Sequence, residues 1–460
     1  MASQLGSPER ALRVAVIGSG PSGFYAVEPL LASPLNIKID MFDRLPAPFG
    51  LVRYGVAPDH PNIKNVIKIY EKLALDKRFS FFGNVTVGRD ISLEQLRGFY
   101  DAIIFSCGAQ TDKRLNIPGE DLTGSHTATE FVAWYNGHPD YRERKFDLSC
   151  EVAVVVGQGN VSMDVSRILS KTVDELRNTD MASHAVEALS KSKILEVHLI
   201  GRRGPVQAAF TPPEIKELGE LKNSDVVFND LNDLKLNPES EAELSDPDKL
   251  IRKKNWDILQ EFAKRPPGNK GKRFVIHFLK SPVQIEGQGR VQKLILEKNQ
   301  LIGPAGNQQA QGTGKKEELP CGLVFRSVGY RGVVTPGVPF DDKRGIFPNK
   351  GGRVIEGDKI LKGLYAVGWI KRGPSGVIGT NKPDSAETVK VLFEDVPALT
   401  PCAAPDTNAV KNFLSQKSIR FVDFNDWKKI DAAEIERGKP LGKPREKFIK
   451  IEEMLAAAGK

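Results

Sequence analysis

Cysteine is scarce in this sequence, and the cysteines that are present form no redox or metal motif. Only four occur in 460 residues: Cys107, Cys150, Cys321 and Cys402. None belongs to a C-x-x-C pair or to a Cys/His cluster with the spacing of metal ligands. The pattern excludes a dithiol redox motif and an iron–sulfur ligand set, and it predicts no metal site. Each cysteine is expected to fill a strand or loop position in a reducing compartment.

Long apolar runs are also absent. No stretch approaches the roughly 20 apolar residues that span a bilayer, so no membrane span is expected. The segment from Met1 to Arg13 contains no apolar signal core and only two arginines. It supports neither secretion nor an intact transit peptide, and it leaves open a mature chain whose presequence has been removed.

The composition is that of a globular protein with an excess of positive charge. Hydrophobic residues make up 40% and charged residues 27% of the chain. A chain of 460 residues is too long for one core, so two or three domains are expected. The net charge of +8 favours an acidic partner. Because no nucleic-acid-binding motif accompanies this charge, a nucleic-acid partner is not expected.

A glycine-rich loop occurs twice, each time directly after an apolar run. The first loop, GSGPSG, covers residues 18–23, and the second, GQGNVS, covers residues 157–162. Each pattern is typical of a buried strand, a tight turn and a helix start, where backbone N–H groups and the helix dipole accept a pyrophosphate. One such loop is a weak signal. Two of them predict two bound dinucleotides, as electron transfer between two cofactors requires.

The residues that end the next strand differ between the two copies. In the first copy the strand at 37–42 ends at Asp43, whose carboxylate can accept hydrogen bonds from ribose hydroxyls of FAD or NAD. In the second, the strand at 196–200 ends at Gly201-Arg202-Arg203. Two guanidiniums suit the 2′-phosphate of NADP; the alternative is a solvated turn. Ser162, which stands where the first loop has Gly23, is expected to separate helix and strand slightly.

Strand and helix patterns alternate along the whole chain, which predicts an α/β fold with parallel sheets. We expect a helix near residues 63–75, a strand pair around 81–87, and strands at 102–109, 321–330 and 363–369. A glycine-bearing turn at 373–379 should open a helix over 384–393. The prediction is two Rossmann-like dinucleotide-binding domains, with the NADP domain (110–331) inserted into an FAD domain made of residues 1–109 and 332–460.

Several segments resemble NADPH–ferredoxin reductases of the adrenodoxin reductase type. They are PFGLVRYGVAPDHP, GQGNVSMDVSRIL, GRRGPVQAAFT, VGWIKRGPSGVIGT and GKPREK. The resemblance runs from Val14 to about Lys447, with the motifs in the family's order. It implies FAD and NADP(H) as cofactors and an iron–sulfur ferredoxin as electron acceptor. Bacterial and mitochondrial members share these motifs, so the expected location is the cytoplasm of a bacterium or, for a mature chain, the mitochondrial matrix.

The resemblance also implies the site residues. The family usually has glutamate where this chain has Asp43, so the ribose contact is expected to run through water. The implied flavin-binding residues are Gly18, Gly20, Ser22, Gly23, Asp43, Leu51, Val87, Trp369, Gly376, Val377 and Ile378. The implied NADP-binding residues are Gln158, Gly159, Asn160, Val161, Arg202, Arg203, Glu214 and Gly376.

Three residues are candidates for the chemistry itself. Without a side chain, Gly376 would let the nicotinamide come within hydride reach of the flavin. His60 and Asp164 could couple proton and electron movement as a His–carboxylate pair. Alternatively, Asp164 only orients the loop that carries His60. Trp369 either covers a ring or belongs to the core.

A basic segment suggests where a partner docks. A surface of this charge would attract an acidic ferredoxin; the alternative is a solvated helix and loop. A second possible docking place is a positive rim at Arg53, Lys371 and Arg372. The basic segment contains Arg252, Lys253, Lys254, Lys264, Arg265, Lys270, Lys272 and Arg273.

These observations lead to one main function and two alternatives. The main one is an FAD-dependent enzyme that takes hydride from NADPH and passes single electrons to a ferredoxin. The first alternative is an NADPH-dependent flavoprotein that reduces another acceptor, such as a quinone. The second is a non-enzymatic FAD-containing docking or sensing protein.

Overall fold

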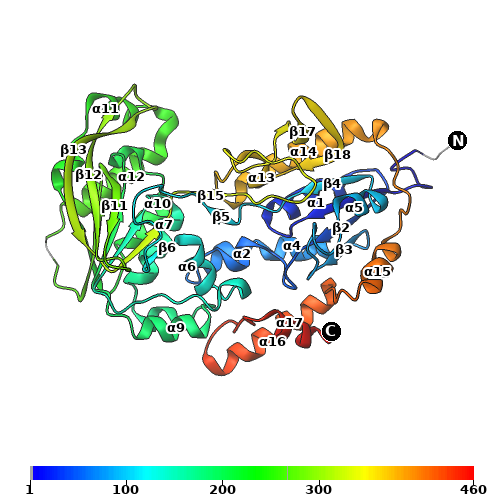
Figure 1. Cartoon of the computed structure of the whole chain (residues 1–460), viewed down its shortest axis with the longest axis horizontal. Coiled ribbons are helices and arrows are strands. Elements are labelled where there is room, and N and C mark those ends of the chain that lie inside the picture. Colours follow the sequence, from blue (N-terminus) through cyan, green and yellow to red (C-terminus); the bar gives the residue numbers. More distant parts are fainter. Residues whose placement is uncertain (1–3, 267) are drawn as a thin grey trace. The chain divides into compact units, whose positions relative to one another are not determined.

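The computed structural model describes residues 4–266 and 268–460 (Figure 1). Met1 to Ser3 of the N-terminal segment therefore lie outside the described residues. The chain forms two compact units. The first unit contains the residues up to Thr111, the short stretch Asn136–Pro139, and Gly329–Lys460; the second contains Asp112–Tyr135 and Asp140–Val328. The assignment of one cofactor to each unit stays a prediction.

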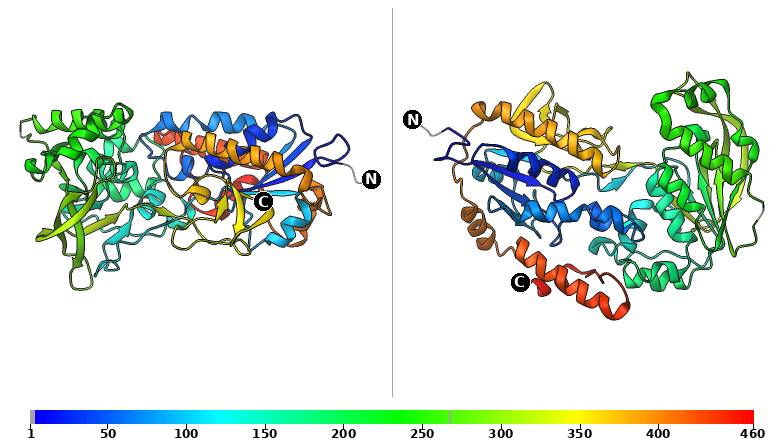
Figure 2. Two further views of the ribbon diagram at one scale, coloured as in Figure 1. Left: turned by 90° about the horizontal axis from the view of Figure 1, so that it is seen from above. Right: turned by 180° about the vertical axis from the view of Figure 1, so that it is seen from behind.

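The first unit is built on a seven-stranded sheet whose central strands are parallel. Along β1, Val14 and Val16 face one core, whereas Ala15 and Ile17 face the other, so both faces are covered. Helices α1 (Pro21–Ala32) and α14 (Asn381–Asp395) lie side by side (Figure 2). The strand order is β16 (Asn349–Lys350), β17 (Arg353–Glu356), β18 (Lys359–Ala366), β4 (Ala102–Phe105), β1 (Leu12–Ile17), β2 (Ile37–Phe42), β3 (Phe79–Phe82).

The second unit contains a fully parallel six-stranded sheet. Its order is β6 (Ser125–Thr127), β14 (Leu323–Arg326), β7 (Val152–Val156), β8 (Glu196–Ile200), β10 (Lys272–His277), β9 (Ser224–Phe228). A separate antiparallel sheet, visible in Figure 1, consists of β11 (Lys280–Glu286), β12 (Lys293–Ile302) and β13 (Gln309–Pro320). In β7 the side chains again alternate between two cores.

The remaining helices cover these sheets or connect their strands. In the first unit they are α2 (Leu51–Tyr54), α3 (Pro61–Lys64), α4 (Ile67–Ala74), α5 (Leu93–Phe99), α13 (Trp369–Arg372), α15 (Thr407–Gln416), α16 (Phe424–Gly438) and α17 (Ile451–Ala458). In the second unit they are α6 (Ala128–Tyr135), α7 (Asn160–Ser170), α8 (Val173–Leu176), α9 (Ser183–Ser190), α10 (Pro212–Leu218), α11 (Pro238–Leu244) and α12 (Leu250–Ala263).

In both units, the strand before the glycine loop and its three neighbours in the sheet are arranged in the same order. In the first unit the order is β4-β1-β2-β3, and in the second it is β14-β7-β8-β10. The chain leaves the first unit and returns to it, and the two connecting segments pair through β5 (Thr111–Asp112) and β15 (Tyr330–Arg331). The expected α/β class, with one Rossmann-like unit inserted into another, is confirmed.

Two local expectations are wrong. The helix expected at 63–75 is divided into α3 and α4, because Asn65 and Val66 make tighter bonds of the 3₁₀ type there. The expected strand pair at 81–87 is the single strand β3, since the chain turns at Asn84 (φ 61°) and again at Gly88 (φ 94°).

All four cysteines are free. Within the described part of the chain, no helix is long and apolar enough to cross a membrane.

Candidate dinucleotide sites

The first glycine loop joins β1 to α1 and leaves one side open. Gly18 has φ 107°, and a methyl group there would lie 2.6 Å from the carbonyl oxygen of Ser106. A residue with a side chain would therefore be strained at this turn. At Gly20, by contrast, a methyl group would meet no atom within 4 Å. The open backbone at Gly20, at the start of α1, is suited to the approach of an anion.

Asp43 follows β2 and supports this loop. One oxygen of its carboxylate accepts hydrogen bonds from the Ser19 backbone N–H at 3.0 Å and the Ser19 hydroxyl at 2.5 Å. The other oxygen accepts the Leu45 N–H at 3.0 Å. A carboxylate offers about four acceptor positions, so three donors from the protein leave room for a ribose hydroxyl or a water.

A neighbouring segment closes over the loop and was missed by sequence reasoning. Phe49, buried and with φ 83°, donates its N–H to the Ser19 carbonyl at 3.0 Å. A methyl group on Gly50 would lie 2.9 Å from the Cα of Gly20. The sequence signal for this contact is the PFG triplet at 48–50. Leu51 begins α2 directly after it and is half-buried, as is Val87, which packs on the core of the same unit.

The C-terminal part of the first unit brings a half-buried tryptophan next to a tyrosine. Trp369 begins α13 and donates its indole N–H to the Ser375 carbonyl at 3.1 Å. Its ring stacks on Tyr330, with centroids 5.3 Å apart and planes 27° from parallel. Tyr330 was also missed, because nothing in its sequence context marks it as a ring partner. Ser22, at the start of α1, is buried and accepts a hydrogen bond from Ser385 on α14 through its carbonyl oxygen.

Gly376 lies in the turn that leads into α14. Its φ is 78°, and a methyl group there would lie 2.5 Å from the Thr380 hydroxyl oxygen. The turn itself thus requires glycine, whatever ligand binds beside it. Val377 is exposed and Ile378 half-buried, and a short 3₁₀ turn over Ile378–Thr380 runs directly into α14.

The second loop repeats the backbone of the first in the second unit. Gly157 has φ 126°, and a methyl group there would collide with the carbonyl oxygen of Ser327, whereas Gly159 is open. The Ser162 hydroxyl donates to the Gly159 carbonyl at 2.6 Å. The Gln158 amide donates to the His277 carbonyl at 2.9 Å. Asn160 begins α7, and Val161 beside it is half-buried.

The two arginines after β8 have no anion partner in the part of the chain that the structure describes. Arg202 is exposed and Arg203 half-buried, and neither guanidinium makes a hydrogen bond or ion pair within residues 4–266 and 268–460. Their backbone carbonyls are held by the Asn299 amide at 2.8 Å and the Leu279 N–H at 3.0 Å. Burial and the positive charges of Arg202 and Arg252 lower the pKa of Arg203 from its ordinary value. An anion bound here would relieve that repulsion.

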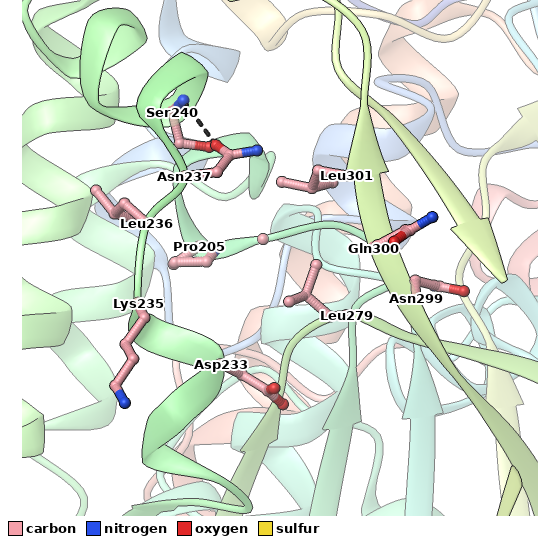
Figure 3. Close-up of a pocket in the computed structure, with 11 residues that line it drawn as sticks. Pro205, Asp233, Lys235, Leu236, Asn237, Ser240, Leu279, Asn299, Gln300 and Leu301 are labelled. Carbon is pink, nitrogen blue, oxygen red and sulfur yellow. Dashed lines mark hydrogen bonds between the residues drawn. The ribbon is translucent and has the colours of Figure 1, made fainter. Parts of the chain in front are cut away.

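A pocket of about 260 Å³ includes in its wall the residues that directly follow this arginine pair in the chain (Figure 3). Gly204 and Pro205, the next residues of the chain, belong to its wall. The side chains of Pro205, Leu236, Leu279 and Leu301 surround it, with Asn237 and Ser240 on one side. The lining also includes Asp233, Lys235, Asn299 and Gln300, so it combines apolar side chains with polar and charged ones.

Asp164 and Glu214 meet the same buried arginine. Arg167 on α7 lies 2.6 Å from Asp164 and 3.1 Å from Glu214, which is in the first turn of α10. Sequence reasoning missed this arrangement, because nothing in the sequence distinguishes Arg167 from an ordinary helical residue. His60 precedes α3 in the first unit and donates its backbone N–H to the Ala57 carbonyl at 3.0 Å. Pairing of His60 with Asp164 stays a prediction.

The basic segment is less free than its sequence suggests. Arg252 pairs with the buried Glu243, and Arg273 pairs with Glu196 at 3.0 Å. Lys270 and Lys272 donate to backbone carbonyls of the unit. Lys253, Lys254, Lys264 and Arg265 remain exposed.

The expected positive rim at Arg53, Lys371 and Arg372 is wrong. Arg53 is only 4% exposed and pairs with Glu434 at 2.6 Å. Lys371 is 8% exposed and pairs with Glu387, and Arg372 pairs with Asp384. These cations are used inside the first unit, which a linear charge count does not reveal.

Two glycine loops with different strand-end residues define a class of oxidoreductase that handles two dinucleotides. The comparisons identify the family within that class. The chain is 45% identical over 458 residues to "NADPH-ferredoxin reductase FprA" of Mycobacterium tuberculosis, covering 97% of this chain and 99% of that protein. It is 41% identical over 466 residues to the human "NADPH:adrenodoxin oxidoreductase, mitochondrial", covering 98% and 93%.

A solved structure gives the same result. Mycobacterium tuberculosis FprA in complex with NADPH superimposes with a TM-score of 0.92 at 44% identity, covering 98% of this chain and all of that chain. No protein-family model matches the sequence. The chain belongs to the family of NADPH–ferredoxin and NADPH:adrenodoxin reductases.

Proposed function

We infer that this chain is an NADPH-dependent oxidoreductase that delivers electrons to a ferredoxin-type protein and uses FAD and NADP(H). The observation that carries this inference is the contrast between the two strand ends. An acid lies beside the first loop, and beside the second lies an arginine pair with no anion partner among the described residues. Bound flavin would accept the two electrons of a hydride together and release them one at a time. The protein supplies binding, orientation and electrostatics.

The first unit is assigned to FAD. The open loop around Gly20 and the start of α1 would accept the pyrophosphate, and Asp43 has acceptor capacity for the ribose. Trp369, stacked on Tyr330, is placed beside the turn at Gly376 through its hydrogen bond to Ser375. The remaining residues assigned to this site are Gly18, Ser22, Gly23, Leu51, Val87, Val377 and Ile378.

The second unit is assigned to NADP(H). Gly159 and the start of α7 would accept the pyrophosphate, and Arg202 and Arg203 would bind the 2′-phosphate. The 2′-phosphate is carried on the ribose next to adenine, so the pocket that begins at Gly204 is assigned to the adenine ring. The remaining residues of this unit assigned to NADP(H) are Gln158, Asn160, Val161 and Glu214.

Gly376, His60 and Asp164 stay the candidates for the reacting region. Gly376 offers an exposed backbone without a side chain, which supports close approach of the nicotinamide. Hydride transfer needs no acid or base, so His60 and Asp164 are assigned either to proton coupling or to structure. The 2.6 Å bond from Arg167 to Asp164 supports the structural role for Asp164.

The partner is proposed to be an acidic iron–sulfur ferredoxin, in keeping with the net charge of +8. The exposed cations at Lys253, Lys254, Lys264 and Arg265 are the docking candidates. A nucleic-acid partner is not proposed. The family includes bacterial and mitochondrial proteins. The proposed compartment is the cytoplasm for a bacterial chain and the mitochondrial matrix for a mature mitochondrial one.

One experiment separates the main function from its alternatives. The purified chain should be yellow, and anaerobic NADPH should bleach it far faster than NADH in a stopped-flow instrument. Ferredoxins and a quinone are then added to the reduced protein. Faster reoxidation by quinone than by any ferredoxin would favour the quinone alternative. A yellow protein that NADPH does not bleach would favour the docking or sensing protein, and a colourless one would refute the assignment of FAD.

A further inference from the structure

Arg252 differs from the two exposed lysines that follow it on α12, because it is half-buried and paired with a buried acid. Its guanidinium contacts Oε1 of Glu243 on α11. Glu243 is only 1% exposed. A buried carboxylate requires a positive counter-charge, and Arg252 provides it. The end of a long and otherwise mobile side chain is therefore held in place.

A series of contacts links Arg252 to the turn that follows β8. Helix α12 packs against the short 3₁₀ turn Pro205–Gln207. The second oxygen of Glu243, Oε2, accepts a hydrogen bond from the Gln207 amide at 3.1 Å. The Gln207 carboxamide lies against Gly204, where a methyl group would be 3.0 Å from Gln207 Oε1. Because Gly204 directly follows the arginine pair in the chain, Arg252 is held close to that pair.

The electrostatics of Arg203 agrees with this geometry. Burial lowers the pKa of Arg203 from its ordinary value, and the positive charges of Arg202 and Arg252 lower it further. Arg202 and Arg203 have no anion partner among residues 4–266 and 268–460. Guanidiniums from the end of β8 and from α12 thus act on one another. A phosphate monoester bound at the pair would interact favourably with all three.

We propose that Arg252 is a third determinant of the preference for NADP(H) over NAD(H), acting with Arg202 and Arg203 on the 2′-phosphate. The proposal rests on the proposed function, because it needs the second unit to bind NADP(H). Arg252 acts in two ways. Its charge adds to the positive site, and its ion pair neutralises Glu243, a carboxylate that would otherwise repel the phosphate. Both effects are strong at a half-buried position, because less water screens them.

The first test compares two ligands that differ only in the 2′-phosphate. The dissociation constants of adenosine 2′,5′-bisphosphate and adenosine 5′-monophosphate are measured by calorimetry on the purified full-length protein, with a competitive titration for the weaker ligand. We expect the bisphosphate to bind at least fivefold more weakly to Arg252→Met than to the wild type, and the monophosphate to change less than twofold. Equal weakening of both ligands, or an unchanged bisphosphate, would overturn the proposal.

A second pair of variants isolates the cation from the acid that it neutralises. Glu243→Gln alone keeps the cation and removes the acid, so the bisphosphate should bind at least as tightly as to the wild type. Adding Arg252→Met to Glu243→Gln should then weaken the bisphosphate at least threefold. This comparison leaves no unpaired buried acid, so it keeps the test available if Arg252→Met alone does not fold. Weaker binding to Glu243→Gln itself, or no further loss in the double variant, would overturn the proposal.

Arg273→Met is the matched control. Arg273 also pairs with a glutamate, Glu196 at 3.0 Å, but Glu196 is the first residue of β8 and the arginine pair follows its last. Both ligands should bind Arg273→Met as they bind the wild type, and a loss equal to that in Arg252→Met would overturn the proposal.

The wild type tests the proposed function separately. If it binds neither ligand, or does not prefer the bisphosphate, the proposed function fails. If it prefers the bisphosphate and the Arg252 variants match it, only the role of Arg252 fails.

Discussion

Gly18 and Gly157 stand at the same place in two units of the same strand order. Each follows a buried strand, each has a positive φ, and each lies against a backbone carbonyl from the next strand, that of Ser106 or that of Ser327. Beyond each, Gly20 or Gly159 leaves the backbone open at a helix start. The backbone arrangement that receives a pyrophosphate is therefore repeated within the chain.

The side chains at the end of the neighbouring strand differ. The Asp43 carboxylate accepts two hydrogen bonds from Ser19, which orient it toward the glycine loop at 18–23. Arg202 and Arg203 have no internal partner among the described residues, although their backbone carbonyls are held. The difference indicates that the common backbone provides affinity for a dinucleotide, whereas the strand end determines which one binds.

The largest expected effect comes from breaking each loop in turn. Gly18→Ala forces a side chain onto a positive φ against Ser106, a strain of about 1–3 kcal/mol in a loop that must also bind its cofactor. We expect colourless, inactive protein from Gly18→Ala. The equivalent Gly157→Ala should remain yellow but lose most of its reduction by NADPH. Flavin absorbance and stopped-flow bleaching measure the two outcomes, and loss of flavin from both variants would contradict the assignment of one cofactor to each unit.

The next effect concerns the turn at Gly376. Gly376→Val strains the φ of 78° and crowds the Thr380 hydroxyl, besides blocking the approach of nicotinamide. The rate of flavin reduction by NADPH should fall at least 100-fold, while flavin content stays at least partly intact because the Gly18 loop is unchanged. Gly379→Ala is the matched control, since a methyl group there meets no atom within 4 Å. A near-normal rate in Gly376→Val would show that nicotinamide approaches from elsewhere.

The third effect tests the strand end directly. Each phosphate–guanidinium pair should contribute about 1.5–3 kcal/mol. Arg202→Ala combined with Arg203→Ala should therefore raise the KM for NADPH at least tenfold and leave the KM for NADH nearly unchanged. Steady-state kinetics with both cofactors measures the difference. An equal rise for the two cofactors would mean that the arginines are structural and the comparison with Asp43 is misleading.

The parts of the site that follow directly from a local pattern could be predicted from sequence. The glycine loops, Asp43 and the arginine pair each adjoin an apolar strand, and the carboxyl ends of parallel strands meet at one edge of a sheet. Ser106 and Tyr330 could not be predicted, because they reach their contacts from distant segments, whereas Phe49 was missed although the PFG triplet marks it. Arg53 and Lys371 were misjudged for the same reason: their carboxylate partners lie on other elements of the fold.

The smallest expected effect concerns the partner rather than the cofactors. Lys253 and Lys254 are exposed on α12, whereas Arg252 beside them pairs with the buried Glu243. Reversing only the two lysines to glutamate should lower ferredoxin-linked cytochrome reduction several-fold at low salt. The salt dependence should also flatten, because exposed charges are screened over about 8 Å at physiological ionic strength.

The controls for this prediction separate docking from catalysis. Reduction of a small neutral dye should hardly change in Lys253→Glu with Lys254→Glu, since a dye needs no docking surface. Arg252→Glu, by contrast, places a second acid beside Glu243 and should lower the thermal midpoint of the protein. An unchanged ferredoxin rate at low salt in the lysine variant would exclude this face of α12. Lys264 and Arg265, the exposed cations just after α12, would then be the next candidates for the docking surface.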